Sequence, residues 1–184
     1  MGFRRIAVTG DSAGGNLALV LASSVASKPL SVKATLVGVV ALSPVTDLSL
    51  SGETYETRAE AEWYFTRPQV AELVSAYVGD ADPKNPWASP LYASLTGLCP
   101  VRVHVGDDEV LLDDSRRYVE RAVAAGVDAR LDIWMGMPHG FVAYVGQLKA
   151  AALALDAVGE FLTEMLTYES YNTEPHKLQK EVDR

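Results

Sequence analysis

The amino-acid sequence predicts an α/β fold in which a parallel sheet is flanked by helices. Two observations support this class: short, almost wholly apolar runs recur along the chain, and segments with helical spacing of apolar residues separate them. The apolar runs have the length of strands that are buried on both faces of a sheet. Because parallel strands are joined by a crossover, usually a helix, this alternation indicates βαβ units.

Four apolar runs are expected to form the strands of the sheet. The first extends from Ile6 to Thr9 and stops at Gly10, and the other three span residues 36–42, 101–105 and 129–134. Helices are expected at residues 16–27, 113–125 and 148–165, where apolar residues recur with helical spacing. Gly126 follows the second of these helices and is a typical helix stop signal.

Residues 46–98 interrupt the alternation. They are more polar, contain helical patterns around residues 53–64 and 68–78, and continue into a segment rich in Pro, Asp and Asn. We therefore expect a helical cap insertion that lies over the carboxyl edge of the sheet. Residues 1–166 then form one domain including this insertion, and residues 167–184 form a polar C-terminal tail.

Composition narrows the classes of function. The chain has 184 residues, 48% of them hydrophobic, which suits one domain with a sizeable core. Its 16 Lys and Arg against 24 Asp and Glu give a net charge of −8, which argues against nucleic acid as a partner. Cys99 is the one cysteine, so we expect neither an internal disulfide nor a cysteine metal cluster. We also expect no membrane span and a cytoplasmic location, because no uncharged apolar window of about 18 residues and no signal peptide pattern occur.

The segment Gly10-Asp11-Ser12-Ala13-Gly14 follows the first expected strand and precedes the first expected helix. In a G-x-S-x-G turn of this kind, the small flanking residues let strand and helix approach each other closely. The turn exposes the Ser12 hydroxyl at the carboxyl edge of the sheet. It also directs the backbone N–H of Ala13 to the place where an oxyanion would form. Ser12 is therefore the candidate nucleophile.

A serine nucleophile needs a base, and the chain has three histidines. His104 lies inside the third expected strand, where a packed strand residue is the simpler interpretation. His176 belongs to the polar tail, which does not hold an imidazole in register. His139 follows the last expected strand and shares the sheet edge of Ser12, because the carboxyl ends of parallel strands meet there. Elimination leaves His139 as the base.

The acid that orients the histidine is expected between Ser12 and His139, since triads built on such a turn run in the chain order Ser, acid, His. The third expected strand is followed by Gly106-Asp107-Asp108-Glu109, which brings three adjacent carboxylates to the same edge. Composition does not choose among them. For two of them, a solvated loop or a cap of the next helix is the alternative role.

These motifs together resemble the hormone-sensitive-lipase-like carboxylesterases of the α/β-hydrolase family. The resemblance covers nearly all of residues 5–166. It rests on five segments: Gly10 to Asn16, Ser43-Pro44 with Asp47-Leu48, Ser89-Pro90-Leu91, Gly106 to Ser115, and Gly136 to Phe141. It implies hydrolysis of small carboxylic esters with short to medium acyl groups, through an acyl-enzyme and with neither a metal nor an organic cofactor.

The resemblance also implies which carboxylate belongs to the triad. Many family members carry an Asp-Pro-Leu-x-Asp segment whose first Asp is catalytic, and its Leu and last Asp superpose on Leu111 and Asp113. Glu109 then takes the catalytic position, while Asp108 remains the alternative because a loop shift of one residue would exchange the two. The implied set is Ser12, Glu109 and His139, with the Ala13 N–H as an oxyanion donor.

One departure from the family concerns the oxyanion hole. The His-Gly-Gly-Gly loop that the family carries ahead of the serine motif does not occur in this sequence. We therefore expect a partial hydrolase domain, truncated or started late, with impaired activity. In such a domain the strand from Ile6 to Thr9 is an exposed edge that favours self-association. The alternatives to an esterase are a lactone hydrolase of the same family and a non-catalytic, hydrolase-like binding module.

Overall fold

A computed structural model describes residues 4–28 and 34–167, and in it four strands form one parallel sheet. The strands are β1 (Arg5–Asp11), β2 (Thr35–Leu42), β3 (Val101–Gly106) and β4 (Ala129–Trp134), and they lie side by side in that order. Every neighbouring pair is parallel. The predicted α/β class is confirmed. The expected tail at 167–184, which contains His176, lies outside the described residues beyond Thr167.

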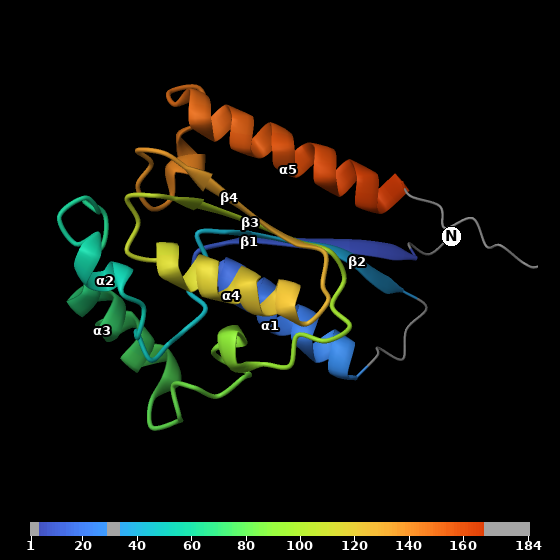
Figure 1. Cartoon of the computed structure of the whole chain (residues 1–184), viewed down its shortest axis with the longest axis horizontal. Coiled ribbons are helices and arrows are strands. Elements are labelled where there is room, and N and C mark those ends of the chain that lie inside the picture. The colour runs from blue at the N-terminus through green and yellow to red at the C-terminus, as the bar shows by residue number, and fades with distance from the viewer. Residues whose placement is uncertain (1–3, 29–33, 168–184) are drawn as a thin grey trace, which may run out of the picture.

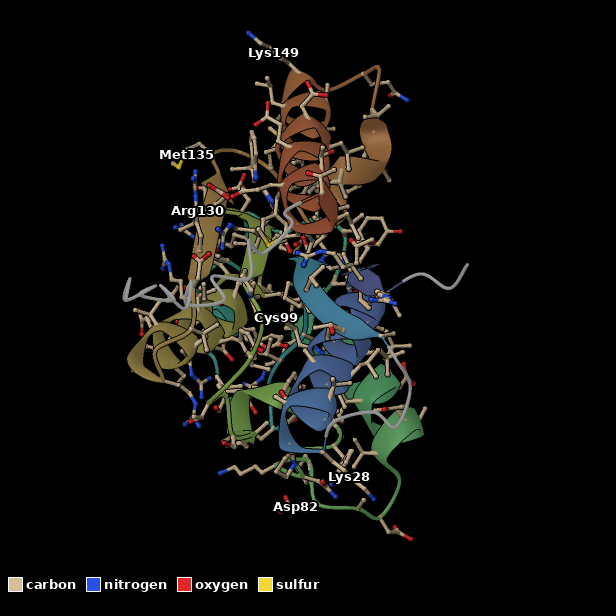
Figure 2. All side chains as sticks on the ribbon, turned by 90° about the vertical axis from the view of Figure 1, so that its right-hand side faces the viewer. Lys28, Asp82, Cys99, Arg130, Met135 and Lys149 are labelled. Atoms are coloured by element: carbon tan, nitrogen blue, oxygen red, sulfur yellow. The ribbon has the colours of Figure 1, made fainter. Side chains whose placement is uncertain are left out.

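Helices cover both faces of the sheet (Figure 1). α1 (Ala13–Ser27) and α4 (Leu112–Ala124) pack on one face, and α5 (Lys149–Thr167) packs on the other. Figure 2 shows this layering from the side, with Lys149 of α5 and Lys28 at the end of α1 on opposite sides of the sheet. Among residues 4–28 and 34–167, no helix combines the length and the apolar character needed to cross a membrane.

Strand β2 contributes side chains to the hydrophobic cores on both faces of the sheet. Val39 and Ala41 of β2 belong to the core beneath α1 and α4, whereas Val40 and Leu42 belong to the core beneath α5. Successive side chains of a strand point to opposite faces, so a strand with two buried faces has to be apolar at every position. This is why β2 is a continuous apolar run in the sequence.

The segment between β2 and β3 begins beyond the carboxyl ends of the strands, where its first two helices lie, and then returns along α1 and α4 to the start of β3 (Figure 1). It contains α2 (Thr54–Thr57), α3 (Arg67–Val78) and the short 3-10 helix η1 (Pro90–Tyr92), while η2 (Phe141–Tyr144) follows β4. Asn16 of α1 ties two parts of this segment to the helix, because its Nδ2 donates to the carbonyl oxygens of Val45 and Ala88, each at 2.8 Å.

Two of the predicted helices differ from the structure. The helix expected at 53–64 is the single turn α2, because Glu62, near the end of the expected range, is buried and its carboxylate accepts the backbone N–H groups of Tyr64 and His139. Such tertiary contacts override the helix propensity of a short segment. α1 begins at Ala13, three residues before its expected start, because the helix follows the serine turn directly in spite of its two glycines.

Candidate active site

Ser12 lies on the turn between β1 and α1. Its backbone has φ 55° and ψ −118°, and a positive φ is rare for a residue other than glycine. Its N–H donates to the carbonyl oxygen of Leu42 at 2.8 Å, which holds the turn against β2. A Cβ atom on Gly10 would lie 2.1 Å from the carbonyl oxygen of Gly14. Strand and helix therefore meet at a distance that only glycine permits.

A chain of hydrogen bonds joins Ser12 to two residues from distant loops. His139 Nε2 lies 3.0 Å from Ser12 Oγ, and His139 Nδ1 lies 2.9 Å from Glu109 Oε2. An ionised carboxylate only accepts hydrogen bonds, so Nδ1 carries the imidazole proton and donates a hydrogen bond to Glu109. Nε2 is then the acceptor for the Ser12 hydroxyl. This arrangement permits transfer of a proton from the serine to the imidazole.

Glu109, rather than Asp108, contacts the imidazole. Its side chain is fully buried, and Oε1 accepts the Ser43 hydroxyl at 2.5 Å and the Gly106 N–H at 2.6 Å. These two donors fix the carboxylate with its second oxygen directed to His139. Asp108 is only half-buried, and its backbone N–H donates to the carbonyl oxygen of Met137.

Sequence reasoning did not assign Ser43 to the site. Ser43-Pro44 entered the prediction only as one of the five segments that carry the family resemblance. The signal that could have found Ser43 is a hydroxyl directly after the second expected strand, at the sheet edge of Ser12. In the structure Ser43 has φ 45°, its N–H donates to the carbonyl oxygen of His104, and its hydroxyl donates to Glu109. The strained backbone of Ser43 thus supports the acid.

The loops after β3 and β4 are packed backbone to backbone. The N–H of Gly136 donates to the Asp107 carboxylate, and a Cβ atom on Gly106 would lie 1.9 Å from the carbonyl oxygen of Met137. This contact brings His139 to Glu109. His104 is a packed residue inside β3, whose buried Nδ1 accepts the indole N–H of Trp134 at 3.2 Å.

Three carboxylates act on the protonation of His139. Burial disfavours the charged imidazolium, but the hydrogen bond and charge of Glu109, together with the charges of Asp11 and Glu62, outweigh burial and raise the pKa of His139. The imidazolium that forms when His139 takes a proton is therefore stabilised. The environment suits a general base that is charged during the reaction.

A cavity of about 240 Å³ opens at Ser12 and Ala13 and is lined mainly by apolar side chains. α3 contributes Leu73 and Val74, and Phe65 lies between this wall and His139, with ring centroids 5.1 Å apart. Ala13 is the first residue of α1, and the N–H groups of the first helical turn have no partner within the helix. The cavity thus combines apolar walls with a backbone donor next to Ser12.

This sheet, with a serine turn at its carboxyl edge and a histidine and a carboxylate brought to it by two later loops, defines the α/β-hydrolase class. A family model described as alpha/beta hydrolase fold matches residues 1–143. The chain belongs to this family, and its resemblance to the hormone-sensitive-lipase-like esterases is confirmed by the relatives that it matches.

Two curated relatives and two solved structures illustrate the match. An acetyl-hydrolase of Streptomyces hygroscopicus is 33% identical over 160 residues, covering 86% of this chain and 52% of its own. An esterase of Acinetobacter venetianus is 32% identical over 161 residues, covering 87% of this chain and 52% of its own. An esterase from the bacterial hormone-sensitive lipase family superposes with a TM-score of 0.83 at 38% identity, covering 88% of this chain and 53% of its own. An esterase/lipase from an uncultured bacterium superposes with a TM-score of 0.81 at 36% identity, covering 88% of this chain and 53% of its own. The chain thus spans about half the length of the curated relatives that it matches.

Proposed function

We propose that this chain acts as a serine hydrolase on carboxylic esters with short to medium acyl groups. The observation that carries the proposal is the chain of hydrogen bonds from Ser12 through His139 to the buried Glu109. The apolar cavity beside Ser12 supports an acyl group as its occupant. The relatives' names, esterase and acetyl-hydrolase, support an ester as the substrate.

In the proposed mechanism, His139 Nε2 takes the hydroxyl proton while Ser12 Oγ attacks the ester carbonyl carbon. Glu109 keeps the proton on Nδ1 and stabilises the imidazolium. The Ala13 N–H donates to the oxyanion. The ester C–O bond then breaks, and the alcohol leaves with the proton from His139. Water, deprotonated by His139, attacks the acyl-serine, releases the carboxylic acid and restores the Ser12 hydroxyl.

We also propose that these 184 residues turn over esters slowly. The sequence contains no His-Gly-Gly-Gly loop, so the Ala13 N–H is the oxyanion donor that we assign. Loss of one oxyanion donor lowers kcat by about 10²- to 10³-fold. A fluorophosphonate phosphonylates a serine with loss of fluoride. This single reaction with a highly reactive reagent depends less on that donor than turnover of an ordinary ester does.

We expect a fluorophosphonate to label the chain once, at Ser12, because the hydroxyl is hydrogen-bonded to a base. Intact-protein mass spectrometry measures the single adduct, and Ser12→Ala is expected to abolish it. With short p-nitrophenyl esters, the same protein is expected to turn over about 10²- to 10³-fold more slowly than the esterase relatives assayed beside it.

Three results would contradict catalysis by Ser12 or the expected impairment. A folded chain, verified by circular dichroism, that takes up no fluorophosphonate contradicts catalysis and favours a hydrolase-like binding module. Turnover at the level of the relatives contradicts the impairment but leaves the serine chemistry intact. Labelling that persists in Ser12→Ala places the nucleophile elsewhere.

We also propose that two chains associate through β1. This strand lies at one edge of the described sheet, and its Ile6 side chain is 42% exposed. An apolar edge strand offers unpaired backbone groups to a second strand. We expect the mass measured by light scattering to rise with protein concentration, and Ile6→Lys to suppress the rise. Ile133→Lys on the other edge strand, β4, is the matched control. A monomer at every concentration, or an equal effect of both substitutions, contradicts the assignment to β1.

A further inference from the structure

A buried carboxylate of the segment between β2 and β3 lies beside His139 but outside the hydrogen-bond chain. The Glu62 side chain is 4% exposed, although the residues on either side of it, Ala61 and Trp63, are exposed. Removing a carboxylate from water is costly unless polar groups replace the water. The burial of Glu62 therefore indicates a specific partner.

That partner is the backbone of the loop that carries the histidine. Glu62 Oε2 accepts the N–H of His139 at 3.2 Å, and Oε1 accepts the N–H of Tyr64 at 2.9 Å. Both oxygens act as acceptors, which is the role of an ionised carboxylate. A single side chain thus connects the segment that covers the sheet edge with the loop after β4.

The histidine loop has a backbone that needs such a restraint. His139 stands between Gly136 and Gly140, whose φ angles are 69° and 70°, and glycine restricts the backbone less than any other residue. Phe65 packs edge-on against the imidazole, and the Tyr64 ring lies at a centroid distance of 6.0 Å. The Glu62 bond and these two rings hold His139 from the side of the segment between β2 and β3.

Glu62 also adds to the charge around the imidazole. The carboxylates that face His139 come from three elements: Glu109 from the loop after β3, Asp11 from the end of β1, and Glu62. The Tyr64 ring, which carries a phenol group, lies 6.0 Å from the imidazole between centroids. Burial raises the pKa of Glu62, and the two N–H bonds that it accepts offset part of this rise.

We propose that Glu62 is a positioning residue: it holds the backbone of His139 so that the imidazole stays between Ser12 and Glu109, and its charge favours the imidazolium. This inference rests on the proposed function. Glu62 itself does not touch the reacting atoms; it acts through His139.

The first test does not depend on catalysis. We expect Glu62→Gln to lower the pKa of His139, and NMR of the imidazole Cε1–H signal against pH measures the change. The pKa of His139 falls because the nearby carboxylates stabilise the imidazolium, and the substitution removes one of these charges. His139→Gln assigns the signal. Glu60→Gln removes the same charge from an exposed position of the same segment, and we expect it to leave the titration unchanged.

The second test follows the rate of fluorophosphonate labelling against pH. His139 has to be neutral to accept the Ser12 proton, so a lower pKa moves the acid limb of the profile to lower pH in Glu62→Gln. Glu62→Ala also removes the acceptor for the His139 N–H, and we expect its maximal rate to fall about 10- to 100-fold through misplacement of the imidazole. A merely structural residue would change stability without moving the acid limb.

An unchanged His139 titration together with an unchanged pH profile in Glu62→Gln would overturn the inference. A parent chain that is not labelled at any pH overturns the proposed function instead, and the NMR titration then still decides whether Glu62 acts on His139. Glu62→Gln keeps an oxygen acceptor for one N–H group, so it carries both tests if Glu62→Ala does not fold.

Discussion

Replacing Glu109 by Gln is expected to lower the rate of Ser12 labelling by a fluorophosphonate about 10³- to 10⁴-fold. The amide of Gln can donate to His139 Nδ1, which moves the imidazole proton to Nε2, where it faces Ser12. The imidazolium also loses the buried counter-charge that lies 2.9 Å away. The amide oxygen still accepts from Ser43 and Gly106, so the fold is expected to persist. The second-order rate constant of labelling and a circular dichroism spectrum measure the two effects.

Asp108→Asn is the matched control, because it removes the same charge from the adjacent position. We expect this variant to be labelled at the rate of the parent chain, since Asp108 directs its backbone N–H, and not its carboxylate, into the contact with the loop after β4. A large loss in Asp108→Asn with little loss in Glu109→Gln would exchange the two roles.

Gly106→Ala is expected to reduce stability and labelling together. The new Cβ would lie 1.9 Å from the carbonyl oxygen of Met137 and 2.6 Å from its carbon, and both atoms belong to backbone. The loop that carries His139 therefore has to move away from Glu109. We expect the free energy of unfolding to fall by about 1–3 kcal/mol. A displacement of about 1 Å at His139 lowers the labelling rate by about 100-fold. Urea denaturation and the labelling assay measure these changes.

The control for this substitution adds the same methyl group elsewhere. A Cβ atom on Gly159 in α5 meets no atom within 4 Å, and replacing a helical Gly by Ala is expected to stabilise the chain by about 0.8–1.0 kcal/mol. Labelling in Gly159→Ala is expected to match the parent chain. If Gly106→Ala retains both the parent stability and the parent labelling rate, the contact between the two loops does not position His139.

The strands of this fold can be predicted from the sequence because their signal is local. β4 coincides with the apolar run expected at 129–134, and β1, β2 and β3 extend the expected runs by one or two residues at an end. The helix expected at 53–64 is reduced to α2, because that prediction used the local sequence pattern alone. There, the burial of Glu62 against the His139 loop decides the course of the chain, and helix propensity is too weak to oppose it.

The sequence by itself determined the α/β class, the turn that carries Ser12 and the placement of His139 at the same sheet edge. Each of these follows from a pattern within a few residues: an apolar run, a glycine-flanked turn, or a position directly after a strand. The family resemblance favoured Glu109 but left Asp108 open, and only the tertiary structure decided that Glu109 contacts His139 and that Ser43 and Glu62 hydrogen-bond to these two residues. The reason is that adjacent carboxylates differ only in where their side chains point. The partners that fix Glu109 include Ser43 and His139, 66 and 30 residues away along the chain, and no local pattern contains them.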